Sequence, residues 1–158
     1  MLVNELIETI ERGGDEAHTA ALTLGLLIER EKVRRPAGDD GGVRVMLGDE
    51  LATRRLSDDE LQTAVDELIE YLSRTSEPHP TAVWALTKSY DPRIVPPLIE
   101  LLNKIITDPD KKHLAYQALI GIINTGPNES VVLAAVQRAA REGLGQVKET
   151  AQSYLTLH

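Results

Sequence analysis

The sequence predicts an all-α protein built as an α-solenoid of antiparallel helix pairs, a HEAT-like or ARM-like superhelix with about seven to eight helices. Ala85-Leu86 recurs as Ala118-Leu119, 33 residues later, and Asp91-Pro92 is answered by Gly126-Pro127, 35 residues later. Between these points, apolar residues recur at spacings of three and four, as on one stripe of a helix. A period of this length is typical of helical pairs that bury their apolar faces only by stacking.

Composition favours one soluble domain over residues 1–158. The chain has 158 residues, no phenylalanine and no cysteine. Its core must therefore consist of Leu, Ile, Val and Ala, and it has no disulfide or thiolate site. Glu5 and Glu8 interrupt what would be the apolar part of a signal peptide, and no apolar run reaches membrane-spanning length. We expect a cytoplasmic protein without a membrane segment.

The net charge of −8 bears on the choice of partner. Affinity for phosphate backbones comes largely from clustered Lys and Arg, so this charge disfavours nucleic acid. A basic protein partner fits the charge better.

The first helix is expected from Leu2 to Ile10 and ends at Gly13-Gly14, because glycine is favoured after a helix end. Asp15 is expected to cap a second helix that stops before Pro36. Residues 36–50 then form an irregular loop insertion, with a small hairpin at Val43-Arg44-Val45 as one possibility. Insertions in solenoids often lie on the binding side, so this loop is a functional candidate; the alternative is a mobile surface loop.

Ser57-Asp58-Asp59-Glu60 matches a capping box and predicts a helix start. Asp59, Asp66 and Glu70 would then form an outer acidic column on this helix, with Glu60 and Glu67 as a second column. Like charges one turn apart repel, so a basic partner would gain by neutralising them. An ordinary solvated helix face is the competing interpretation.

Residues 80–141 carry the best-defined repeats. Pro78 and Pro80 separate them from the preceding helix. Asp91-Pro92 and Asp108-Pro109 are expected to open helices, since the carboxylate caps free amides and proline needs none. Gly126-Pro127 ends a helix. Residues 144–158 are expected to form a C-terminal capping helix.

The segments AVWALTKSYDPRIVPPLIELL and DPDKKHLAYQALIGIINTG resemble tandem HEAT-like repeats of the short kind found in phycobilisome lyases. The resemblance extends over residues 80–141 and implies an α-solenoid with a binding surface. By analogy, the second helix of each pair would line the concave side. The candidate partner-binding residues are the positions on these helices that are expected to be exposed: Asp59, Asp66, Glu70, Arg93, Glu100, Lys104, Gln137 and Arg141.

The sequence contains no pattern that predicts catalysis, a cofactor or a metal. His18, His79, His113 and His158 are scattered and show no His-Glu-x-x-His spacing, which disfavours a zinc enzyme. Neither a phosphate-binding glycine loop nor a Gly-x-Ser-x-Gly elbow is present. Trp84 and Tyr116 are expected to pack within the repeats rather than to anchor a partner.

Three functions remain open. The favoured hypothesis is a non-catalytic protein-protein interaction module, an adaptor or immunity-type inhibitor, whose acidic concave surface binds a basic protein. The second, implied by the resemblance alone, is a lyase-like chaperone subunit for a chromophore protein. The third is a nucleic-acid binder or enzyme on the same scaffold, for which the candidate basic clusters are Arg34, Arg35, Arg54, Arg55 and Lys111-Lys112.

Overall fold

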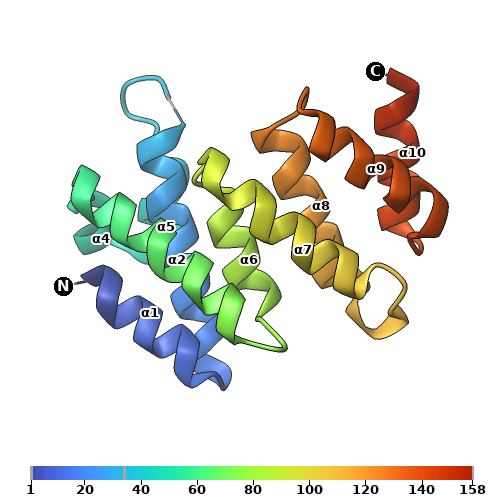
Figure 1. The fold of residues 1–158 in the computed structure, drawn as a ribbon. Coiled ribbons are helices and arrows are strands. Elements are labelled where there is room, and N and C mark those ends of the chain that lie inside the picture. The colour runs from blue at the N-terminus through green and yellow to red at the C-terminus, as the bar shows by residue number, and fades with distance from the viewer. Residues whose placement is uncertain (1, 34, 158) are drawn as a thin grey trace. The chain divides into compact units, whose positions relative to one another are not determined.

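A computed structural model describes residues 2–33 and 35–157. Arg34, one of the candidate nucleic-acid contacts, and His158 lie outside the described residues. Within them the regular structure is helical and there is no strand, which confirms the all-α prediction (Figure 1). The α-helices are α1 (Leu2–Arg12), α2 (Asp15–Lys32), α3 (Val43–Leu47), α4 (Asp49–Thr53), α5 (Asp58–Arg74), α6 (Pro80–Thr87), α7 (Val95–Ile105), α8 (Lys112–Thr125), α9 (Ser130–Glu142) and α10 (Gln146–Leu157).

Eight of these helices span eight residues or more, which agrees with the expected number. The two others, α3 and α4, have five residues each and lie at the end of the insertion. No helix in the described ranges combines the length and the apolar character that crossing a membrane requires.

The chain divides into two compact units, Met1–Ser89 and Tyr90–His158. The expectation of one domain over residues 1–158 stays a prediction.

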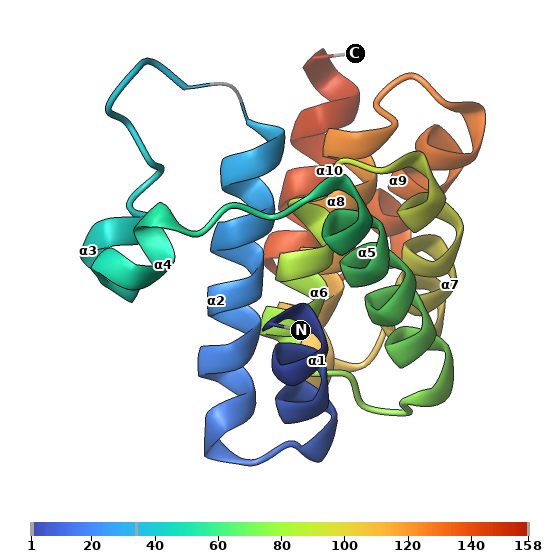
Figure 2. The ribbon, with the colours of Figure 1, turned by 90° about the vertical axis from the view of Figure 1, so that its left-hand side faces the viewer.

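The first unit is a two-layer arrangement of antiparallel helix pairs. Helix α1 packs on α2, α5 packs on α6, and the pairs stack through the contacts α1–α5 and α2–α6 (Figures 1 and 2). The seams contain side chains with no exposed surface, including Leu24, Leu27, Ile28 and Leu86. Burial of such aliphatic side chains stabilises each by about 1.5–3 kcal/mol, and no single helix pair provides enough facing surface to achieve it.

Helices α2 and α6 approach each other closely at Gly25. A Cβ atom built on Gly25 would come within 2.3 Å of the Trp84 ring and 3.1 Å of the Ala85 Cα. Glycine therefore allows the α6 backbone and the indole ring to lie directly against α2. Trp84 is part of the helix seam, as the sequence predicted.

The second unit repeats the two-layer plan. Helix α7 packs on α8 and α9 packs on α10, while α7 contacts α9 and α8 contacts α10. The stripe predicted from spacing is buried at Val95, Leu98, Leu102 and Ile105. Ala118 and Leu119 have no exposed surface, as is also true of their counterparts Ala85 and Leu86 in the first unit.

Three helix starts follow from local capping, as predicted at Ser57, Asp91 and Asp108. The Ser57 hydroxyl accepts from the Glu60 amide while the Glu60 carboxylate accepts from the Ser57 amide, which completes the capping box. Asp91 and Asp108 accept from amides two residues ahead, and each starts a short 3-10 turn, Pro92–Ile94 and Pro109–Lys111, before the α-helix. One prediction was wrong: Gly14 occupies the N-cap of α2, and Asp15 is the first residue inside the helix.

The hairpin considered for Val43-Arg44-Val45 was also wrong, because these residues begin α3. The Asp40 carboxylate accepts hydrogen bonds from the amides of Gly42 and Arg44, at 3.0 Å each. These bonds satisfy amides at the start of the helix, which outweighs the β propensity of two valines. The bond from the Arg44 amide is the main reason that the pKa of Asp40 lies below its usual value.

The α2–α6 contact generates a prediction about Gly25. We expect Gly25→Val to lower the free energy of unfolding by about 1–3 kcal/mol, because the added atoms overlap the Trp84 ring and backbone that cannot move freely. Chemical denaturation of the variant measures the loss. Thr19→Val, at an exposed position of the same helix, is the matched control, and an equal loss in that control would contradict the packing argument.

Candidate functional site

The three acidic candidates of the first unit lie together on α5. Asp59, Asp66 and Glu70 are exposed and occupy one side of the helix, as their spacing predicted. We call these three residues the acidic α5 face. Glu70 also accepts from Arg74 at 2.9 Å, and Arg74 reaches Glu11 of α1, so one end of the face is partly neutralised.

The second acidic column expected on α5 is not present as such. Glu60 is 9% exposed and forms an ion pair of 2.6 Å with Arg54, in addition to its role in the capping box. The Arg54 pair, followed by the Ser57 amide, lowers the pKa of Glu60. The Glu60 carboxylate thus joins Arg54, at the end of the insertion, to α5. It is not exposed for binding to a partner.

The other candidates lie in the second unit, where all five are exposed. Glu100 and Lys104 are one turn apart on α7 and pair at 3.4 Å. Arg93 lies in the turn before α7 and pairs with Asp91 at 3.0 Å. Gln137 and Arg141 lie on α9, which contacts α7. These five residues carry both signs of charge. Among the candidate residues, a purely acidic column therefore occurs on α5 and not in the second unit.

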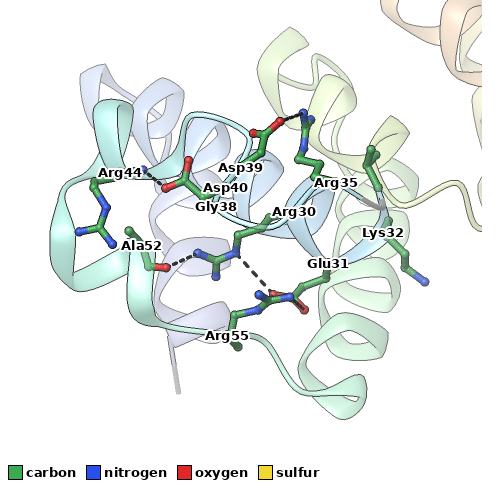
Figure 3. A pocket seen from close by; sticks show the side chains of 11 residues that line it. Arg30, Glu31, Lys32, Arg35, Gly38, Asp39, Asp40, Arg44, Ala52 and Arg55 are labelled. Carbon is green, nitrogen blue, oxygen red and sulfur yellow. Dashed lines mark hydrogen bonds and ion pairs between the residues drawn. The ribbon is translucent and has the colours of Figure 1, made fainter.

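A cavity of about 560 Å³ lies where the insertion meets the C-terminal end of α2 (Figure 3). We call it the arginine pocket. Five positive side chains line it against three carboxylates, although the whole chain is acidic. The positive side chains are Arg30, Lys32, Arg35, Arg44 and Arg55, and the carboxylates are Glu31, Asp39 and Asp40.

Arg30 forms the inner wall of this pocket. Its residue exposure is 7%, and one guanidinium nitrogen donates to the carbonyl oxygens of Leu51 and Ala52, at 3.0 Å each. The other terminal nitrogen donates to the Arg54 carbonyl. A single side chain of α2 thus holds the chain segment that leads from α4 into α5.

Two carboxylates near the pocket are each shared by two cations. Glu31 binds Arg55 at 2.7 Å and lies 3.5 Å from Arg30 Nε. Glu29 binds Arg35 at 2.8 Å and Lys88, the residue that follows α6, at 2.9 Å. Hydrogen bonding to Glu31 raises the pKa of Arg55 further above its usual value. These pairs fix the guanidinium groups without cancelling all of their charge.

The loop itself is shaped around Arg35. Gly41 has φ +69°, and a Cβ atom there would lie 2.9 Å from Arg35 Nε. Glycine at this position therefore avoids both backbone strain and a clash with the guanidinium. Asp39 accepts from the Gly41 amide at 2.9 Å, which closes the turn.

At the opposite end of α2, two histidines face each other. The ring centroids of His18 and His79 are 5.8 Å apart. His79 caps α6, since its Nδ1 accepts from the Thr81 amide at 3.1 Å, and its own amide donates to the Tyr71 hydroxyl at 2.9 Å. Burial, and secondarily His18, lowers the pKa of His79. A second cavity of about 610 Å³, lined in part by Tyr71, Arg74 and His79, lies at this end.

Among the described residues, no group of three or more His, Cys, Asp or Glu side chains could hold a metal ion. Two of the basic side chains considered for nucleic acid are bound to carboxylates: Arg54 binds Glu60 and Arg55 binds Glu31.

Comparison with known proteins gives a match over one repeat. Residues 81–104 match the PBS lyase HEAT-like repeat. The matched segment runs from α6 to α7, within the stretch on which the resemblance was based, and confirms it there. HEAT-like repeats commonly mediate protein interactions or scaffolding. No match was found among curated proteins or among solved structures.

The arginine pocket was missed as a site at the sequence level. Arg35 and Arg55 were considered only as nucleic-acid contacts, and Arg30 and Arg44 were not singled out. The available signal was an Arg-rich segment bordering a Gly- and Asp-rich insertion that was itself a functional candidate. Its members span residues 30–55, so their convergence depends on the tertiary structure.

The hydrogen bonds of Arg30 should stabilise the end of the insertion. We expect Arg30→Met to lower the free energy of unfolding by about 2–3 kcal/mol, because three carbonyl oxygens lose a charged donor. Hydrogen exchange should accelerate at residues 51–57. Lys32→Met, an exposed position on the same helix, is the control; unchanged exchange in Arg30→Met would contradict the role assigned to this side chain.

His79 should make stability depend on pH. Its folded pKa lies below that of the unfolded chain, so the unfolded state binds more protons as the pH falls through the ordinary histidine range near 6.5. The free energy of unfolding should therefore decrease from pH 7.5 to pH 5.5. In His79→Asn, whose amide oxygen can cap α6 at either pH, urea unfolding should show a smaller decrease. His113→Asn on the exposed side of α8 should retain the full decrease.

Proposed function

We propose that this protein is a non-catalytic protein-binding module whose acidic α5 face engages a basic segment of a partner protein. An adaptor and an immunity-type inhibitor both fit this proposal. The observation that carries it is the alignment of Asp59, Asp66 and Glu70 on one exposed side of a capped helix.

The physical argument concerns repulsion and its relief. Asp66 and Glu70 are one turn apart, and like charges at this spacing destabilise a helix by a few tenths of a kcal/mol, of which the Glu70–Arg74 pair offsets a part. A lysine- or arginine-rich segment along α5 would relieve this repulsion and gain ion pairs. Electrostatic complementarity of this kind mainly raises the association rate and determines which partner binds. The net charge of −8 would assist the encounter at longer range.

The scaffold supports this role. HEAT-like repeats commonly serve protein interaction, and the matched segment follows α5 directly in the chain. In the first unit α5 packs on α1 and α6 through its buried side, with Val65 and Leu68 in the seams. Its opposite side therefore keeps a fixed orientation. Binding of a partner would then require little loss of conformational entropy in this helix.

Binding of a defined oligolysine peptide tests the location of the surface. The variant Asp59→Asn, Asp66→Asn, Glu70→Gln should weaken binding about tenfold, since three exposed ion pairs each contribute on the order of 0.5 kcal/mol. Fluorescence anisotropy at two salt concentrations measures it, and the wild-type affinity should fall as salt rises.

The matched control removes the same number of charges elsewhere, in Glu5→Gln, Glu8→Gln, Glu16→Gln. These three residues are exposed on α1 and α2. If both triple variants weaken binding equally, overall charge rather than the acidic α5 face governs the interaction. Salt-independent binding by the wild type would contradict the electrostatic basis of the proposal.

A further inference from the structure

We propose that the arginine pocket binds the phosphate groups of a small phosphorylated molecule. This inference is independent of the acidic α5 face, because it concerns other residues and the opposite sign of ligand charge. It begins from the contrast between an acidic chain and a pocket with two more positive side chains than carboxylates.

A smaller positive excess remains when the surrounding ion pairs are considered, because Asp49 binds Arg44 at 2.6 Å. Adding Lys88, Glu29 and Asp49 to the lining side chains gives six cations against five carboxylates. Glu31 is shared by Arg30 and Arg55, and Glu29 is shared by Arg35 and Lys88. Two carboxylates thus serve four cations. The oxygens of Asp40 accept from the backbone amides of Gly42 and Arg44, which commits this carboxylate to the loop. Asp39 lies 3.9 Å from Arg35, beyond hydrogen-bond distance.

Unused hydrogen-bond donors of the pocket arginines also favour an anionic ligand. Arg30 Nε and Arg35 Nε are buried and make no hydrogen bond among the described residues, although the Glu31 carboxylate lies 3.5 Å from Arg30 Nε. Arg30 is more than nine-tenths buried, so its charge lies away from bulk solvent. Buried polar groups are normally hydrogen-bonded, so these two Nε–H groups are donors that a bound anion or an ordered water can satisfy. Figure 3 shows Arg30 between Arg55 and Arg35 on the pocket wall.

The chemistry of the donors favours phosphate. Guanidinium groups bind phosphate oxygens in a planar, two-bond geometry, and charge-assisted bonds of this type are the strong ones. A phosphate group offers more oxygens to several guanidinium groups at once than a single carboxylate does. The cavity of about 560 Å³ is larger than one phosphate and falls in the range of small-molecule sites, about 300–1,000 Å³.

The flanking structure keeps these groups in place before a ligand arrives. Arg30 is fixed by the carbonyls of Leu51 and Ala52, and Arg35 by Glu29. Gly41 leaves room for the Arg35 guanidinium, since any side chain there would meet it. Such preorganisation lowers the cost of ordering the site on binding. Arg55 lies at the mouth of the pocket, with a side chain that is 66% exposed and bound to Glu31.

Calorimetric titration with pyrophosphate at fixed ionic strength tests the proposal. The wild-type protein should bind pyrophosphate more tightly than inorganic phosphate. Arg55→Gln and Arg35→Gln should each weaken pyrophosphate binding about tenfold, through loss of a charge-assisted contact. Arg55→Lys, which keeps the charge and loses the planar fork, should give an intermediate loss. Arg93→Gln, in the other unit, should bind as the wild type does.

A second measurement guards against misfolded variants. In the wild-type protein, pyrophosphate should slow hydrogen exchange in residues 35–55, and Arg93→Gln should show the same protection. Absence of both heat and protection at millimolar pyrophosphate would overturn the proposal. Citrate binding as tightly as pyrophosphate would replace the phosphate assignment with a general polyanion. An oligonucleotide that binds more tightly than pyrophosphate through Arg35 and Arg55 would overturn it in favour of nucleic acid.

Discussion

The organisation of the first unit beyond its helix seams depends on the buried guanidinium of Arg30. It projects from α2 and holds the carbonyl oxygens of Leu51, Ala52 and Arg54, so the return of the insertion to the helical stack is fixed by one side chain. Arg54 then binds Glu60, which completes the cap of α5. The start of the helix that carries the acidic α5 face is therefore connected to α2 through two arginines. Both candidate surfaces of this unit rest on that connection.

Much of the fold could be predicted because its determinants are local. Capping at Ser57, Asp91 and Asp108 requires residues two or three positions away, and the apolar stripe of α7 repeats within one helix. Prediction was wrong where a local preference was overruled by a specific bond. Val43 and Val45 favour a strand, but Asp40 caps the turn before them and a helix begins.

The two candidate surfaces differ in how visible they are in the sequence. The acidic α5 face consists of residues on one helix, so helical spacing alone places Asp59, Asp66 and Glu70 together. The arginine pocket collects side chains from α2, the loop, α3 and the segment before α5. Nothing in the order of residues 30–55 indicates that these guanidinium groups converge. Glu60 illustrates the same limit: its spacing suggested a displayed charge, whereas a tertiary ion pair removes it from the surface.

The attachment of residues 36–53 has an evolutionary consequence. This segment is tied to the stack by polar bonds from Arg30 and by the buried side chain of Val43, while the apolar seams of α1, α2, α5 and α6 are formed without most of it. Its α3 helix leaves Val45 88% and Met46 58% exposed, so these two side chains contribute little to the core. The length and composition of this segment can accordingly change during evolution with little effect on the helix seams. A stack of this kind can therefore acquire new ligand preferences while its core residues stay the same.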